Sequence, residues 1–116
     1  MILGNFFAIF ASFMGVPGTE FTTVGSLMGT TLVLNDIVAY VDLPSLPQML
    51  SEKSFVIACV ALCSFGNFGS IAIQLGGIGE LAPNQRKNLA RLGVRALICG
   101  TLTGYMSAAI AGILLN

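Results

Sequence analysis

The stretch FGNFGS, residues 65–70, decides how this chain folds, because it places two glycines, an asparagine and a serine inside a charge-free run. That run extends over residues 54–79, and about 20 helical residues are enough to cross the ~30 Å hydrocarbon core of a bilayer. Glycine and polar side chains disfavour an uninterrupted helix, so we expect a break at mid-membrane depth. Because irregular backbone at that depth must be satisfied by protein or by a water-filled cavity, the break is a predicted binding site.

The composition of the chain is that of a membrane protein. Of its 116 residues, 55% are hydrophobic and 9% are charged, and the mean hydropathy is +0.90, whereas soluble domains carry roughly 25% charged residues. The formal net charge of 0 lacks the basic footprint of a nucleic-acid-binding protein. The absence of histidine excludes histidine-based metal sites and catalytic triads, so we predict no enzyme, no metal site and no resident cofactor.

Turn signals and the positions of the charges divide the chain into helical segments. Residues 15–18, GVPG, end an apolar first helix. Two apolar segments flank Asn35-Asp36 and are each too short to span, which predicts a hairpin that re-enters the side it came from. We therefore predict an all-α membrane protein formed by one segment, residues 1–116. Its parts are a membrane helix at 1–15, a re-entrant hairpin at 19–43, a broken transmembrane helix at 52–78 and a final transmembrane helix at 86–115.

Basic residues cluster at the start of the last predicted helix and set its orientation. Arg86, Lys87, Arg91 and Arg95 lie within ten positions. By the positive-inside rule this end faces the cytoplasm, which puts the C-terminus outside the plasma membrane, in bacteria the inner membrane. Further along this helix, small residues recur every four positions and let a neighbouring helix approach closely. This small-residue stripe comprises Ala96, Gly100, Gly104, Ala108 and Gly112.

Asp36 is the first candidate for a functional side chain. A carboxylate within a membrane span is costly and is by default functional. It can accept hydrogen bonds from two adjacent hydroxyls of a sugar or polyol, or bind a cation or a proton. The alternative is that Asp36 only caps a helix at the hairpin tip. Asn67 and Ser70, three residues apart, are expected to face one cavity, and helix–helix hydrogen bonding is the alternative for this pair.

Several motifs in order resemble one transporter family. The sequence GSLMGT at residues 25–30 is followed by LNDIVAY at residues 34–40, and ALCSFGNFGSI occupies residues 61–71. GGIG at residues 76–79 and ARLG at residues 90–93 come next. Together these motifs resemble the second hairpin and the closing segment of the concentrative nucleoside transporters, bacterial nucleoside permeases included. The similarity covers nearly all of the chain.

The resemblance implies a cation-coupled nucleoside symporter with an elevator-like transport domain built from inverted repeats, usually as a homotrimer. It implies that Asp36 contacts the ribose hydroxyls, that Asn67 and Ser70 complete this side of the site, and that Phe65 lines the pocket. Asn35, beside Asp36, is a further candidate. The family's base-reading motif and its coupling-ion ligands, for Na⁺ or H⁺, lie in segments that do not appear in these residues. We therefore expect the C-terminal part of a permease, inactive alone, whose partner is the N-terminal transporter half.

The chain departs from the family pattern at the predicted site. The family has Glu at the position of Asp36, and one methylene less withdraws the carboxylate by roughly 1.5 Å. Gly66 and Gly69 stand where Ala and Ser are usual, which adds backbone freedom at the break and removes one hydroxyl.

Two other functions are compatible with a chain of this length. One is an independent small membrane transporter or antiporter subunit, although such exporters carry an essential acid in a full-length first span and residues 1–19 contain none. The other is a non-transporting remnant or assembly partner that packs against a permease through the small-residue stripe.

Overall fold

The computed structural model describes residues 2–46, 48–64 and 66–116, and within these ranges all regular structure is helical. The all-helical class predicted from the sequence is thus confirmed. In chain order the elements are α1 (Ile2–Phe13), α2 (Phe21–Val33), α3 (Asp36–Asp42), the 3₁₀ turn η1 (Leu43–Ser45), α4 (Glu52–Leu62), α5 (Phe68–Leu81), the 3₁₀ turn η2 (Pro83–Gln85) and α6 (Arg86–Leu114).

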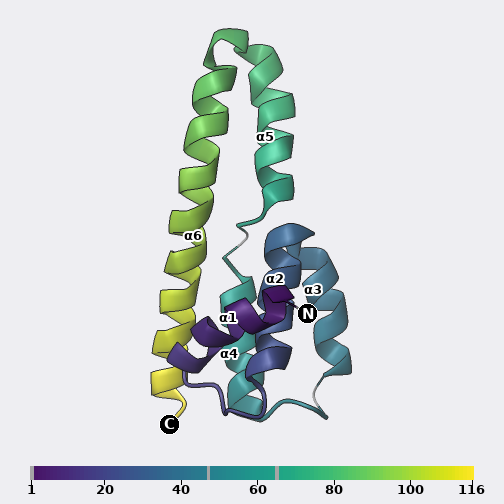
Figure 1. Ribbon diagram of the computed structural model, residues 1–116, viewed down its shortest axis with the longest axis vertical. Helices are drawn as coiled ribbons and strands as arrows, with labels where there is room; N and C mark the ends of the chain where they lie inside the picture. The colour runs from purple at the N-terminus through teal and green to yellow at the C-terminus, as the bar shows by residue number, and fades with distance from the viewer. Residues whose placement is uncertain (1, 47, 65) are drawn as a thin grey trace.

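The 29-residue helix α6 runs along most of the molecule, whose extents are 49 × 25 × 22 Å (Figure 1). Helices α4 and α5 follow one another beside it, while α1, α2 and α3 lie at the level of its C-terminal half, with α3 on the side away from α6 (Figure 1). One continuous helical stretch, Pro83–Leu114, is long and apolar enough to cross a membrane, while α1 and α2 are shorter apolar helices. The main core lies where α1, α2 and α4 meet the C-terminal half of α6.

Helices α1 and α2 pack closely because glycine removes the side chain between them. A Cβ added to Gly25 would collide with the backbone of α1, at the carbonyl oxygen of Gly4 and 2.6 Å from the nitrogen of Ala8. One turn later, a Cβ on Gly29 would lie 3.2 Å from the Leu3 side chain. The two glycines therefore set the distance between α2 and α1 and leave the opposite face of α2 to the rest of the hairpin.

Among the described residues, the small-residue stripe on α6 packs closely against other parts of the chain along its second half and not along its first. A Cβ on Gly104 would collide with the Ser64 side chain, one on Gly112 would collide with the Met14 carbonyl, and Ala108 is fully buried. In contrast, Ala96 is exposed and nothing lies within 4 Å of a Cβ built on Gly100. The close packing expected from this stripe thus occurs beside α1 and α4, while beside α5 the stripe borders open space.

At the end of the molecule that holds the C-terminus, Glu20, which precedes α2, forms hydrogen bonds with the residue before α4. The backbone amide and the hydroxyl of Ser51 donate to the Glu20 carboxylate at 3.1–3.2 Å. Hydrogen bonds from the Ser54 hydroxyl and from Ser51 hold the pKa of Glu20 below its usual value. Because Ser51 also caps α4 through the Ser54 amide, this network joins the start of the hairpin to the start of α4.

Candidate functional site

The tip of the α2–α3 hairpin meets the break between α4 and α5. Helix α2 ends at Val33 and α3 begins at Asp36, while α4 ends at Leu62 and α5 begins at Phe68. Figure 1 shows the tip beside the break, partway along α6. A Cβ on Gly69 would lie 3.5 Å from the Leu34 carbonyl oxygen, so the two interruptions are in contact. Four helix ends converge here, with free backbone N–H and C=O groups that can bind a polar ligand.

Asn67 is the buried centre of this junction. Its side chain, 4% exposed, caps α5, since Oδ1 accepts from the backbone amide of Ser70 at 2.8 Å and from the Ser70 hydroxyl at 3.1 Å. Its amide Nδ2 faces Asp36 and lies 3.5 Å from each carboxylate oxygen, at the outer limit of a hydrogen bond. The carbonyl of Asn67 is therefore committed to α5, whereas its amide has only weak contacts within the chain.

Asp36 is the first residue of α3, and Asn35 is the residue that caps this helix. The Asn35 side chain accepts from the Val38 amide at 3.0 Å. The alternative role of Asp36 as a helix cap is therefore wrong. The Asp36 carboxylate is partly exposed, and among the described residues its side-chain hydrogen bonds are the two long contacts with Asn67. A carboxylate acceptor thus lies beside an amide donor, an arrangement that suits a hydroxyl group, which accepts and donates at once.

The structure brings four of the five predicted site residues together, namely Asn35, Asp36, Asn67 and Ser70. The fifth, Phe65, lies outside the described residues, so its role as a pocket wall stays a prediction. The helix-capping roles of Asn35 and Asn67 were not anticipated from the sequence, although asparagine directly before an apolar helical run is a known capping signal.

Tyr40 is a further residue of the site region that sequence reasoning did not single out. Its hydroxyl donates to the Cys59 carbonyl at 3.2 Å and lies 3.0 Å from the Cys63 sulfur. These contacts join α3 to α4 one turn below the break. Tyr40 therefore acts as a support for the hairpin arm that carries Asp36.

A cavity of about 180 Å³ adjoins Asn67 on the side that faces α6. Polar side chains of α5 and the break form one wall, and the uncovered half of the small-residue stripe forms the other. The lining residues are Ser64, Gly66, Asn67, Ser70, Ile71, Gln74, Gly93, Ala96, Leu97 and Gly100. Gln74 is thus a polar residue of the site region that was missed, although its spacing of four from Ser70 could have indicated it.

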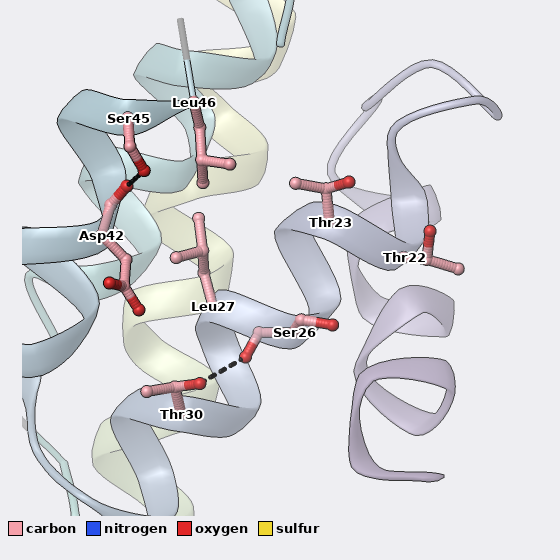
Figure 2. A pocket seen from close by; sticks show the side chains of 8 residues that line it. All are labelled: Thr22, Thr23, Ser26, Leu27, Thr30, Asp42, Ser45 and Leu46. Atoms are coloured by element: carbon pink, nitrogen blue, oxygen red, sulfur yellow. Dashed lines mark hydrogen bonds between the residues drawn. The ribbon is translucent and has the colours of Figure 1, made fainter. Parts of the chain in front are cut away.

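A larger open cleft of about 410 Å³ lies lower in the hairpin and contains none of the predicted site residues (Figure 2). Two of its polar side chains bind nearby backbone, since the Thr30 hydroxyl donates to the Ser26 carbonyl and the Ser45 hydroxyl donates to the Asp42 carbonyl (Figure 2). The other lining residues are Thr22, Thr23, Leu27 and Leu46. We place the site at the tip and break because helix ends, a partly exposed carboxylate and a buried amide converge there.

No group of three or more His, Cys, Asp or Glu side chains within the described part of the chain could hold a metal ion. The tip and break provide a carboxylate, amides, hydroxyls and helix ends as hydrogen-bonding groups. Such groups can pair with the hydroxyls of a ligand.

Almost the whole chain is similar in sequence to known proteins. The family model described as "Na+ dependent nucleoside transporter C-terminus" matches residues 1–112. The uncharacterized transporter YutK of Bacillus subtilis is 48% identical over 97% of this chain and 28% of its own length. The nucleoside permease NupC of Helicobacter pylori is 38% identical over 100% of this chain and 29% of its own.

A solved structure shares the fold. The transporter CNTnw in an inward-facing substrate-bound state matches with a TM-score of 0.87 and 43% sequence identity, over 96% of this chain and 28% of that one. The chain therefore spans less than a third of the length of these relatives.

Proposed function

Since this chain belongs to the Na⁺-dependent nucleoside transporter family, we propose that it supplies the ribose-binding side of a cation-coupled nucleoside symporter in the plasma membrane. The observation that carries the proposal is the pairing of the Asp36 carboxylate with the Asn67 amide where the hairpin tip meets the break. A ribose hydroxyl accepts from the amide while donating to the carboxylate. The vicinal hydroxyls of ribose are the pair that one carboxylate can receive.

The membrane arrangement follows from the lengths and ends of the helices. Helix α6, at about 1.5 Å per residue, exceeds the ~30 Å hydrocarbon core and is the transmembrane element. Helices α2 and α3 have 13 and 7 residues, too few to span, and the hairpin begins and ends at the same end of the molecule (Figure 1). We infer a re-entrant hairpin at 19–43, a membrane helix at 1–15, a broken transmembrane segment at 52–78 and a final helix at 86–115.

The orientation in the membrane rests on charge. Arg86, Lys87, Arg91 and Arg95 occupy the end of α6 near η2, and all four are exposed. The positive-inside rule assigns this end to the cytoplasm and the C-terminus to the outside. The ribose site then lies between the two surfaces, at the depth that alternating-access transporters use for their substrates.

The remaining functions belong to the rest of the transporter. We propose that base recognition and the ligands of the coupling Na⁺ or H⁺ lie in the N-terminal half, that the complete protein is a homotrimer, and that residues 1–116 alone are inactive.

A chimera tests the proposal. In the Helicobacter pylori nucleoside permease, the C-terminal segment aligned with this chain is replaced by residues 1–116, and uptake of labelled uridine is measured in cells. We expect uptake that collapses when the ion gradient is dissipated. A chimera that reaches the membrane and carries no uridine would overturn the proposal and favour a non-transporting remnant.

A second experiment tests the chain without the rest of the transporter. Purified residues 1–116 in proteoliposomes are expected to show no uridine uptake under an imposed Na⁺ or H⁺ gradient, because the proposal assigns base recognition and the ligands of the coupling ion to the N-terminal half. Robust uptake by the pure chain would instead identify an independent small transporter.

A further inference from the structure

We propose that Gln74 is a specificity-determining residue of the nucleoside site, whose carboxamide binds the ribose 5′-hydroxyl from within the 180 Å³ cavity beside the break. The inference rests on the proposed function, because it extends the same site by one helical turn. The cavity would receive the 5′-hydroxymethyl group of the nucleoside.

Three polar side chains of α5 form a line along one face. Asn67, Ser70 and Gln74 are separated by three and four residues, the spacing that places side chains above one another on a helix. Over the seven steps from Asn67 to Gln74 the chain rises by about 10 Å in helical geometry. Because side chains lean toward the helix N-terminus, the carboxamide of Gln74 is directed back toward Ser70 and the break. All three residues line the cavity.

The wall of the cavity formed by α6 has mostly small side chains, which leave space for a ligand. From α6, Ala96 presents only a methyl group and nothing lies within 4 Å of a Cβ built on Gly100, while Leu97 supplies the larger side chain of this wall. A volume of about 180 Å³ holds a hydroxymethyl group together with several waters, since each water occupies about 30 Å³ of liquid. The uncovered half of the small-residue stripe is thus explained by the cavity that it borders.

The Ser70 hydroxyl leaves a ligand hydroxyl in need of a hydrogen-bond donor, which Gln74 supplies. The Ser70 hydroxyl donates its proton to Asn67 Oδ1, so it can only accept from a ligand. Gln74 is exposed, and among the described residues no hydrogen bond engages its carboxamide. A carboxamide without a partner is costly within a bilayer, which requires that water or a ligand satisfies it. A hydroxyl that donates to Ser70 and accepts from Gln74 satisfies both side chains.

The identity of that hydroxyl follows from the chemistry at Asp36. A carboxylate that receives two adjacent hydroxyls uses the 2′ and 3′ hydroxyls, the vicinal pair of a ribonucleoside. The 5′-hydroxyl is the sugar hydroxyl that remains. It stands on an exocyclic carbon that extends away from this pair, and the line from Asn67 to Gln74 provides its partners.

The test measures KM for uridine, 2′-deoxyuridine and 5′-deoxyuridine in the permease chimera and in its Gln74→Ala and Gln74→Met variants. Methionine keeps the length of glutamine without its hydrogen-bonding groups, which controls for lost packing. Gln48→Ala, in the exposed loop before α4, is the matched control and is expected to match the unsubstituted chimera for all three substrates.

We expect both Gln74 variants to raise KM about three- to tenfold for uridine and for 2′-deoxyuridine, the loss that one hydrogen bond between neutral groups produces. KM for 5′-deoxyuridine is expected to stay unchanged, so that the preference for uridine over 5′-deoxyuridine disappears. An equal change for all three substrates, or no change, would overturn the role of Gln74 while uridine uptake by the chimera upholds the proposed function. Absence of uptake by the unsubstituted chimera would overturn both.

Discussion

Replacement of Asp36 by asparagine is the most direct perturbation of the ribose site. Asparagine has the shape of aspartate, but it loses the negative charge and exchanges one acceptor oxygen for a donor. A ribose that gives two hydroxyl protons to the carboxylate then loses one hydrogen bond and keeps a weaker one. The negative charge and one of the two acceptor oxygens of Asp36 are thus the only features that this change removes.

The size of the effect follows from the contacts at the site. Hydrogen bonds to charged groups contribute about 1.5–3 kcal/mol and those between neutral groups about 0.5–1.5 kcal/mol. Loss of one bond and weakening of the other therefore costs about 2.5–4.5 kcal/mol of binding free energy, or about a 70- to 2,000-fold increase in uridine KM. Folding is expected to change little, because the contacts of Asp36 with Asn67 are 3.5 Å long and its interaction with the α3 dipole is worth about 1 kcal/mol or less.

The assay is uridine uptake by the permease chimera as a function of uridine concentration, together with thermal unfolding of the detergent-purified protein. Asp42→Asn is the matched control, since it makes the same chemical change on the same hairpin, in the separate cleft of Figure 2. We expect its uridine KM to match that of the unsubstituted chimera. A KM for Asp36→Asn within threefold of the unsubstituted value, or equal losses in both variants, would refute the assignment of Asp36 to the ribose.

Three further predictions concern the scaffold of the site and are measured by thermal unfolding of the purified chimera. Gly25→Ala is expected to lower the melting temperature because its Cβ collides with the α1 backbone, whereas Gly76→Ala, in open space, leaves it unchanged or raises it; equal effects would contradict the close packing. Asn67→Ala removes the α5 cap and is expected to cost about 1 kcal/mol of stability; an unchanged melting temperature would argue against the cap. Because the pKa of Glu20 is lower in the folded protein than in the unfolded chain, ionised Glu20 stabilises the fold at pH values above the unfolded pKa, near 4.5. This stabilisation is lost as the pH falls through the folded pKa. Glu20→Gln is expected to reduce the loss of stability in acid, and an unchanged dependence of melting temperature on pH would exclude the hydrogen bonds between Glu20 and Ser51 as its cause.

Much of the local structure was predictable because it depends on neighbouring residues. Charge-free runs and turn residues indicated an all-helical chain, and polar residues inside an apolar run indicated the hairpin tip at Asn35-Asp36. They also predicted an interruption at residues 65–70, which the structure places slightly earlier, between Leu62 and Phe68. A carboxylate inside an apolar hairpin was conspicuous without any coordinates, because burial of a charge in an apolar medium is costly.

The roles of the individual polar side chains depended on contacts that the sequence does not contain. Asp36 and Asn67 are 31 positions apart, and their approach to 3.5 Å requires the hairpin tip to rest on the break. Asn35 and Asn67 cap helices, which the spacing of the motifs did not distinguish from ligand contact.

The sequence by itself thus determined the helical class and which polar groups interrupt the apolar segments, because hydropathy and backbone preference act within a few residues. Only the tertiary structure decided which interruptions meet and which half of the small-residue stripe stays open beside Gln74. Those outcomes depend on how closely helices distant in sequence can approach, at Gly25 on α1 and at Gly104 on Ser64, and packing of this kind is a property of the whole fold.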